Sequence, residues 1–365
     1  MKIAVIPGDG IGPEIVAQGL RALEALQSSF DLPVETFTVA AGAQLYADTG
    51  VAIRKDDFQA TVAADAVYLG AIGLPHVRYA DGTEINGELM CRWRRDLDLY
   101  ANIRPLRSFP SVPTIYAKPR DVDMIVVREG TEGLYAANGG GAMIGDRIVS
   151  DPMIITREGS ERVSRIAFEL ARKHPPRNGN KPKVTCLDKA NIIRGFALFR
   201  RSFETVARAF PDVEAEALYA DAASTLMTLN PERYHVVVCE NLLGDIFSDL
   251  AAAYVGGLGL AGSGEIGDQR GLFQSAHGSA PTLTGKNVAN PIAQIISLAM
   301  LLGWWADRAR DKRFADASAA LERAIGITLS DRANHTGDLG GSATTSRVGD
   351  AVVAALSRSA KAVMA

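Results

Sequence analysis

Two kinds of pattern alternate along this chain. Short apolar runs rich in β-branched residues predict strands, and longer segments of helical period separate them. The runs cover residues 2–6, 66–70, 123–128, 183–187 and 234–240, and the clearest helical segments cover residues 13–26 and 158–173. The alternation predicts an α/β fold. Strands this apolar are usually covered on both faces, which favours a largely parallel sheet wrapped by helices.

Length and composition narrow the class of protein. A chain of 365 residues suits two domains, or two lobes that share a core. Its 47% hydrophobic and 22% charged residues are typical of a folded globular protein. The formal net charge of -3 provides no overall positive field for a phosphate backbone. Nucleic acid is therefore not expected as a partner.

The apolar segments and the cysteines predict a cytoplasmic protein without a membrane anchor. The opening apolar run stops at Pro7, well before the hydrophobic part of a secretion signal could form. The most apolar later stretch, residues 292–306, is shorter than the ~20 residues that a membrane span needs, so it predicts a buried helix. The scattered cysteines lack Cys-x-x-Cys spacing and indicate free thiols in a reducing compartment: Cys91, Cys186 and Cys239.

A glycine-rich turn lies between the first predicted strand and the first predicted helix, and reads Gly8-Asp9-Gly10-Ile11-Gly12-Pro13-Glu14. A Rossmann fingerprint requires its third glycine three positions after the second. Here Gly10 and Gly12 are two apart and Pro13 follows, so the turn does not predict a Rossmann site. Two interpretations remain: a tight turn with Pro13 at the helix start, or the same turn with its backbone against a ligand.

Arginines gather around two predicted elements. Arg92, Arg94 and Arg95 lie on a predicted helix, Arg104 follows where the chain becomes extended, and Arg128 ends a predicted strand. An arginine binds a carboxylate through a planar two-pronged fork, so several of them suit a di- or tricarboxylic acid. Solvated surface charge is the better interpretation for Arg92 and Arg95. It is weaker for Arg128, because α/β folds bind ligands at the carboxyl ends of their strands.

Two further residues can carry protons. Tyr135 follows the strand that ends at Arg128, and a tyrosine beside cations can donate a proton to a carbanion. Taken alone, it is more often a packed aromatic with a hydrogen-bonded hydroxyl. Lys189 directly follows a predicted strand, and a lysine near other cations can lose its proton at neutral pH and act as a base. An isolated lysine in such a loop is usually a surface residue.

Acidic residues suggest a metal. Asp245 and Asp249 are four residues apart, so they lie on one face of a predicted helix, where like charges repel. A hard divalent cation relieves that repulsion, and magnesium or manganese typically binds a few carboxylates together with substrate oxygens. Asp221, after another predicted strand, is a further candidate ligand. The alternative is a solvated acidic face near a helix start, where the helix dipole favours negative charge.

The last motif is a loop of small residues before the apolar helix. It contains His277, Gly278, Ser279 and Ala280, with Asn290 further along. Such residues let the backbone approach a flat or phosphorylated ligand closely. An ordinary capped loop is the alternative.

Taken together and in this order, these segments resemble the isocitrate/isopropylmalate dehydrogenase family, the β-decarboxylating dehydrogenases that include tartrate, D-malate and homoisocitrate dehydrogenases. The resemblance extends from Gly8 to Asn290 and into the following helix. It implies a long twisted mixed sheet with two lobes and no Rossmann fold. Residues 1–103 and 256–365 would form a discontinuous cofactor lobe, and residues 104–255 the lobe for metal, substrate and dimerisation.

The resemblance also implies a role for each motif. The clamp for the substrate carboxylates would be Arg94, Arg104 and Arg128. The ligands of Mg²⁺ or Mn²⁺ would be Asp221, Asp245 and Asp249. Tyr135 and Lys189 match the family's acid and base. The cofactor, NAD, would lie against Ile11, His277, Gly278, Ser279, Ala280 and Asn290. In the family, Lys189 and Asp221 reach into the active site of the other subunit, which implies a homodimer with shared sites.

Alternatives of function and cofactor stay open. A non-catalytic regulatory or ligand-binding subunit would be expected to lack a metal carboxylate or the base, and this chain has all of them. A simple hydroxy-acid dehydrogenase would release no carbon dioxide. NADP is the alternative cofactor, because Thr282 stands where many NAD-dependent members have an acidic residue and neither repels nor binds a 2′-phosphate. NAD is favoured.

The family places the variable group of the substrate against the segment before the arginine helix. Isopropylmalate enzymes have adjacent leucines and an acidic residue there; those positions hold Met90, Cys91 and Gly87 in this chain. Upstream, His76 and Arg78 add polar groups, unless they are merely exposed loop residues. A pocket with unpaired polar groups disfavours an alkyl substituent. We therefore expect D-malate, tartrate or another polar malate as the substrate, with 3-isopropylmalate as the alternative.

Overall fold

The computed structural model describes residues 1–137, 140–177 and 179–363. Its main sheet consists of β1 (Lys2–Ile6), β2 (Glu35–Thr38), β3 (Ala66–Leu69), β4 (Ala101–Arg107), β5 (Asp123–Glu129), β8 (Lys183–Asp188), β9 (Glu214–Tyr219), β10 (Val236–Cys239), β11 (Gly262–Ile266) and β12 (Gly271–Ser275). The helices are α1 (Gly12–Phe30), α2 (Ala43–Thr49), α3 (Lys55–Ala63), α4 (Ile85–Asp96), α5 (Arg157–Lys173), α6 (Arg194–Ala207), α7 (Ala220–Leu229), α8 (Asn241–Tyr254), α9 (Ile292–Ala309), α10 (Lys312–Ser330) and α11 (Thr345–Val363).

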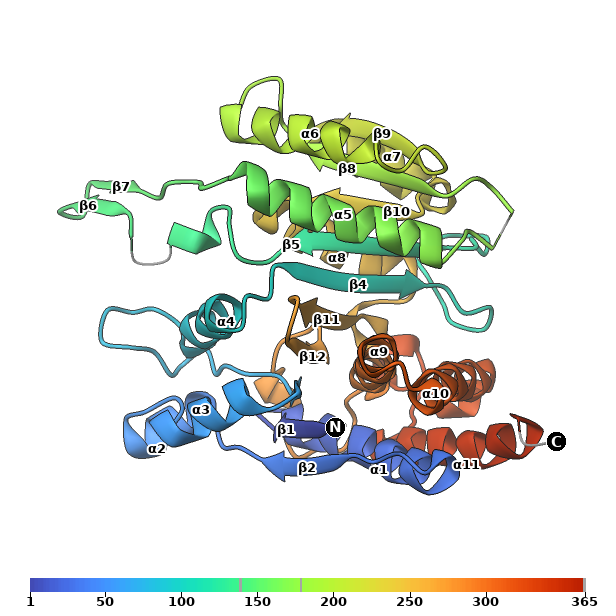
Figure 1. Cartoon of the computed structure of the whole chain (residues 1–365). Coiled ribbons are helices and arrows are strands. Elements are labelled where there is room, and N and C mark those ends of the chain that lie inside the picture. The colour runs from blue at the N-terminus through green and yellow to red at the C-terminus, as the bar shows by residue number, and fades with distance from the viewer. Residues whose placement is uncertain (138–139, 178, 364–365) are drawn as a thin grey trace.

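The sheet runs through the whole molecule in the order β2-β1-β3-β12-β11-β4-β5-β10-β8-β9 (Figure 1). This long mixed sheet confirms the predicted α/β fold. The apolar pattern alone favoured a largely parallel sheet, and that prediction misses the centre, where β11 runs antiparallel to β12 and β4, and β4 antiparallel to β5. The reason is that β4 and β11 carry polar residues for the site and do not stand out as apolar runs.

The half of the sheet that holds β1, β3 and β12 is formed by segments from both ends of the chain. Ile3 and Val5 face a core shared with α1, α9, α10 and α11. The alternate residues Ala4 and Ile6 face a second core with α3 and α4. Because successive side chains of a strand point to opposite faces, a continuous apolar run is what two covered faces require.

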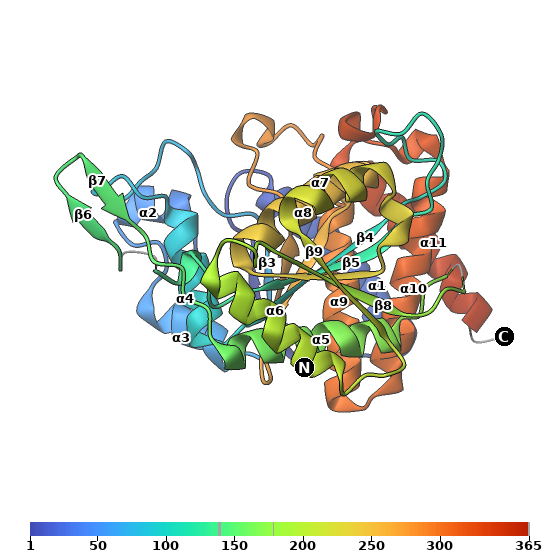
Figure 2. The same ribbon diagram turned by 90° about the horizontal axis from the view of Figure 1, so that it is seen from above.

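The half of the sheet that holds β5, β10 and β8 is also covered by helices on both faces. Val236 and Val238 pack with α5 and α6, whereas Val237 and Cys239 pack with α7 and α8. Figure 2 shows these helix pairs on opposite sides of the strands. All three cysteines are free thiols.

A separate two-stranded arm, β6 (Ala142–Ile144) and β7 (Ile148–Ser150), projects from this half (Figure 1). Its apolar side chains are exposed, which a folded chain rarely tolerates without a covering partner. Within the described ranges, no helix has the length and apolar character needed to cross a membrane.

Candidate active site

Arg128 is the centre of the site, at the carboxyl end of β5 and only 2% exposed. Its Nε and Nη2 donate to Oδ1 of Asn241, at 3.0 and 2.7 Å, and its Nη1 pairs with Asp245. Helix α8 comes this close because residue 244 is glycine, where an added Cβ would lie 2.6 Å from the Arg128 side chain. Burial, together with Arg94 and Arg104, lowers the pKa of Arg128 to about 10, so it remains a cation at neutral pH.

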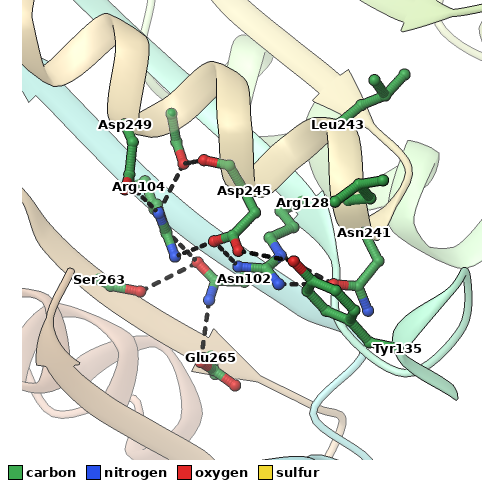
Figure 3. Close-up of polar contacts among 12 residues, drawn as sticks. Asn102, Arg104, Arg128, Tyr135, Asn241, Leu243, Asp245, Asp249, Ser263 and Glu265 are labelled. Atoms are coloured by element: carbon green, nitrogen blue, oxygen red, sulfur yellow. Dashed lines mark hydrogen bonds and ion pairs between the residues drawn. The ribbon is translucent and has the colours of Figure 1, made fainter. Parts of the chain in front are cut away.

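Arg104 on β4 joins the two carboxylates of α8. Its Nη1 donates to Asp249 at 2.9 Å and to the Ser248 hydroxyl at 2.7 Å, and its Nη2 donates to Asp245 at 3.2 Å (Figure 3). Asp245 and Asp249 lie on one face of α8, as their spacing predicts. In this structure a guanidinium relieves their repulsion. Burial raises the pKa of Asp249, and Arg104 partly opposes that shift.

Arg94 on α4 is held by a carboxylate that the sequence reasoning missed. Its Nε and Nη2 donate to the two oxygens of Glu265 on β11, at 2.8 and 2.9 Å. Glu265 is fully buried and also accepts from Asn102 at 3.0 Å. Burial would raise the pKa of Glu265, but the charge and hydrogen bonds of Arg94 outweigh it and lower that pKa. The available signal was an acidic residue inside a strand of small residues, since such a group is almost never buried unpaired.

Tyr135 reaches the same cluster from the loop after β5. Its hydroxyl donates to Asp245 Oδ2 at 3.2 Å, and its ring centre lies 5.4 Å from the Arg128 guanidinium (Figure 3). Burial, and next the charge of Asp245, raise the pKa of Tyr135. The phenol therefore keeps its proton at neutral pH and can donate it.

The cluster is balanced in charge and borders a cavity. Three guanidinium groups face three carboxylates, those of Asp245, Asp249 and Glu265. Addition of a divalent cation together with a dicarboxylate would preserve that balance, as burial of charge requires. A cavity of 160 Å³ lies between α4 and the Tyr135 loop; its lining includes Cys91, Arg94, Gly130, Tyr135, Ala136 and Asn241.

Lys189 and Asp221 form a second group. Lys189 follows β8, Asp221 lies in the first turn of α7, and Lys189 Nζ pairs with Asp221 at 2.8 Å. The pair lowers the pKa of Asp221. Asp188, the residue before Lys189, anchors this loop. It is fully buried, and its carboxylate accepts from Arg200 at 2.7 and 2.8 Å.

The structure does not bring Asp221 to Asp245 and Asp249. In the part of the chain that it describes, no three acidic, histidine or cysteine side chains lie close enough to hold a metal. The strands explain this separation, because Asp221 follows the edge strand β9, whereas Asp245 lies opposite β4 and β5. Two carboxylates of α8 offer the oxygen donors that a hard cation prefers, and a third has to come from elsewhere.

The predicted cofactor segment packs against the glycine turn. The Ile11 amide donates to the Ser279 carbonyl at 2.9 Å, and Ile11 shares a small apolar cluster with Ala280. Gly10 has a positive φ of 59°, and a Cβ there would lie 2.1 Å from the Ser279 carbonyl oxygen. The tight turn that both interpretations include is present, and its backbone contacts the small-residue loop.

Two polar side chains of this segment are engaged within the protein. The Ser279 hydroxyl donates to the Gly73 carbonyl. Asn290 accepts from the Ile292 amide at the start of α9 and donates to Asp338, both at 3.0 Å. Burial lowers the pKa of His277, the neighbour of Gly278, so its imidazole is neutral. The structure thus brings Ile11, Ser279 and Ala280 together, while the amide of Asn290 organises the start of α9.

Buried cations beside a carboxylate helix and a protonated tyrosine, at the central strands of an α/β sheet, define an enzyme site for an anionic ligand and a cation. Comparison with known proteins agrees. The family model described as isocitrate/isopropylmalate dehydrogenase matches residues 2–352. A 3-isopropylmalate dehydrogenase from Leifsonia xyli is 37% identical over 97% of this chain and 98% of its own length.

Further relatives extend this likeness. The 3-isopropylmalate/3-methylmalate dehydrogenase of Methanocaldococcus jannaschii is 39% identical over 96% of this chain and 97% of its own length. The crystal structure of isocitrate dehydrogenase from Methylococcus capsulatus superposes with a TM-score of 0.85 at 34% identity, over 97% of this chain and 99% of that one. The chain belongs to the isocitrate/isopropylmalate dehydrogenase family. It is a decarboxylating dehydrogenase that acts on a hydroxy acid.

Proposed function

We propose that this protein uses a divalent metal and NAD to oxidise and decarboxylate a malate that carries an alkyl group on its third carbon, with 3-isopropylmalate as the first candidate. The observation that carries the proposal is the buried arginine cluster beside a cavity, in which Arg104 and Arg128 pair with Asp245 and Arg94 pairs with Glu265. Guanidinium forks suit the two carboxylates of a malate, and the cavity suits a substituent.

The choice of an alkyl group departs from the polar substituent expected from the sequence. Arg78 is not free, because it donates to Glu84 at 2.7 Å and to the carbonyls of Pro75 and Gly82 at 3.1 and 2.9 Å. The neighbouring Glu88 accepts from the Tyr79 hydroxyl at 2.8 Å. Arg78 and Glu88 are therefore paired within the protein, which weakens the expectation of a polar pocket, and His76 is exposed.

Small residues in the lining of the cavity leave room for a substituent: Cys91, Gly130 and Ala136. The lining also contains Arg95, Asp98 and Thr131, so a small alkyl group fits it better than a large one. One turn of helix before Cys91, a Cβ on Gly87 would meet nothing within 4 Å, so that side of α4 is open. Two relatives act, by their names, on 3-isopropylmalate or 3-methylmalate, which are malates of this kind.

We assign the residues the roles that the family resemblance implies. Arg94, Arg104 and Arg128 bind and orient the substrate carboxylates. Lys189 accepts the proton of the hydroxyl group, directly or through water, and after carbon dioxide leaves, Tyr135 donates a proton to the third carbon. Asp245 and Asp249, with Asp221, would hold Mg²⁺ or Mn²⁺. When bound, the metal would supply polarisation of the hydroxyl and keto oxygens, and NAD would be the hydride acceptor.

A homodimer would bring Lys189 and Asp221 of one copy to the arginine and carboxylate cluster of the other. Ile192 lies three residues after Lys189 and is 75% exposed. Further exposed apolar side chains lie on the β6–β7 arm, at the end of α7 and on α8: Met143, Ile144, Ile148, Val149, Leu229 and Ile246. Such side chains are typical of a surface covered by a partner. We therefore propose that Lys189 and Asp221 act in the site of a second copy, and that residues 1–103 with 256–365 bind NAD in each.

A substrate screen tests the proposal. The purified protein is assayed with NAD, Mn²⁺ and 3-isopropylmalate, 3-methylmalate, D-malate or tartrate, and both NADH and carbon dioxide are measured. We expect the highest kcat/KM for an alkylmalate, with one carbon dioxide for each NADH. A clear preference for D-malate or tartrate would restore the polar-substituent hypothesis. NADH without carbon dioxide would indicate a simple dehydrogenase, and no turnover a binding subunit.

The same assay tests the cofactor. The 281–283 turn and Thr282 are exposed and carry no acidic side chain, so discrimination between the two nucleotides is weak. We expect NAD to be preferred. A preference for NADP of a hundredfold in kcat/KM, about 2.7 kcal/mol, would contradict this.

A further inference from the structure

Asn241 touches three parts of the site and belongs to none of the predicted roles. It is the first residue of α8 and is 1% exposed. Its Oδ1 accepts both bonds from Arg128, at 3.0 and 2.7 Å, while its Nδ2 donates to the Glu132 carbonyl at 2.9 Å. One amide thus joins an arginine of the clamp to the loop that carries Tyr135. Figure 3 shows the side of this link that faces Arg128.

The surrounding contacts make this link short and stiff. Glu240 caps α8 by accepting from the Leu242 and Leu243 amides, at 3.1 and 3.3 Å, which fixes the start of the helix. Gly133, next to Glu132, has a φ of 79°, and a Cβ there would lie 2.0 Å from Glu240 Oε1 and 2.9 Å from Asn241 Cβ. The loop therefore sits directly on the first residue of α8.

The position of Asn241 along α8 relates the loop to the rest of the site. Asp245 lies one turn further along the same helix and accepts from both Arg128 and the Tyr135 hydroxyl. Tyr135 is thus held at its hydroxyl by Asp245 and, through the loop, by Asn241. The amide satisfies both neighbours at once, because its oxygen accepts from the guanidinium and its nitrogen donates to the carbonyl.

We propose that Asn241 is a positioning residue that fixes Tyr135 relative to Arg128, and thereby the proton donor relative to the substrate carboxylates. The inference rests on the proposed function, in which Arg128 binds substrate and Tyr135 donates a proton.

Two substitutions test the hydrogen bonds of Asn241 to Arg128 and to the Glu132 carbonyl separately. In Asn241→Asp the carboxylate still accepts from Arg128, but it cannot donate to Glu132. We expect the KM for the hydroxy acid to stay within about threefold and kcat, at saturating Mn²⁺, to fall about tenfold or more. The solvent deuterium isotope effect on kcat should increase, because proton transfer becomes slower. In Asn241→Leu both contacts are lost, so the KM should rise as well.

A double-mutant cycle with Tyr135→Phe decides the question. If Asn241 acts by positioning Tyr135, Asn241→Asp has no further effect on kcat once the hydroxyl is gone. Asn334→Asp is the matched control, since that amide also donates to a backbone carbonyl, of Thr328 at 3.1 Å, away from the cluster. We expect both Asp variants to unfold at similar temperatures and only Asn241→Asp to lose kcat.

Two results would overturn the inference: wild-type kcat in Asn241→Asp, or a loss of kcat that multiplies fully with that of Tyr135→Phe. A failure of the proposed function looks different, since it appears in the wild-type substrate screen and in Tyr135→Phe alone.

Discussion

The two charged groups near the ends of the sheet strands are built in opposite ways. Arg94, Arg104 and Arg128 are buried, and each has its counter-charge in the same chain. Lys189 and Asp221 pair in the open, with 31% and 68% of their side chains exposed. Buried charges are stable only when every one is paired, so the fold itself fixes the first group. The second group lies at the surface, in a loop and in the first turn of α7, and it can face another chain.

Asp245→Asn should give the largest effect, because Asp245 contacts Arg104, Arg128 and Tyr135 at once. We expect Mn²⁺-dependent kcat to fall about a thousandfold or more. The variant should still fold, but with a lower free energy of unfolding, because the buried Arg128 loses its paired charge. Steady-state assays measure kcat, and circular dichroism reports on the fold. Asp212→Asn, in an exposed pair with Arg172, is the control. Wild-type activity of Asp245→Asn in Mn²⁺ would refute the metal assignment.

Lys189→Met tests the exposed pair that Lys189 forms with Asp221. We expect kcat to fall about a hundredfold or more, as for loss of a general base. The free energy of unfolding should change by less than about 0.5 kcal/mol, since an exposed ion pair contributes little. Urea unfolding measures it. A large loss of stability with little loss of kcat would make this pair structural and remove the contrast between the two groups.

Glu129 gives a smaller effect that depends on pH. It follows Arg128, is 2% exposed and accepts from the Thr131 and Glu132 amides. Burial raises its pKa from 4.5 to about 7. The folded state therefore favours the protonated form, and this contribution to stability is lost as pH rises from about 4.5 to 7 and is constant above that. The change should be about 1–3 kcal/mol.

Urea unfolding of the wild type and Glu129→Gln at several pH values checks this prediction. The difference in unfolding free energy between the two proteins should shift across that interval and level off at higher pH. Parallel pH curves for the two proteins would show that Glu129 does not titrate in this range.

Local pattern was enough to predict much of the fold and several residues of the site. The strand that ends at Arg128 and the helix with Asp245 and Asp249 both follow from periodicity and spacing, which neighbouring residues determine. The family resemblance, which rests on motifs in order, is confirmed by the family model across residues 2–352.

What the sequence could not provide is the set of partners across the sheet. Glu265 is 171 positions from Arg94 and Asn241 is 113 from Arg128, so no local pattern relates them. The pairing of Arg78 with Glu84 also depends on how its loop folds, and it engages one of the two upstream polar residues on which the polar-pocket expectation rested. Long-range packing decides such contacts, and a single sequence does not display it.

The central claim is that one site is completed by residues of two copies of this chain, and complementation tests it directly. Lys189→Met and Asp245→Asn chains, each inactive alone, are unfolded together, refolded as an equal mixture and assayed. If Lys189 acts in the site of the partner, mixed dimers contain one intact site, and activity should return to about a quarter of the wild-type value. If the mixture stays as inactive as its components although mixed dimers have formed, Lys189 and Asp245 act within a single chain and the claim is wrong.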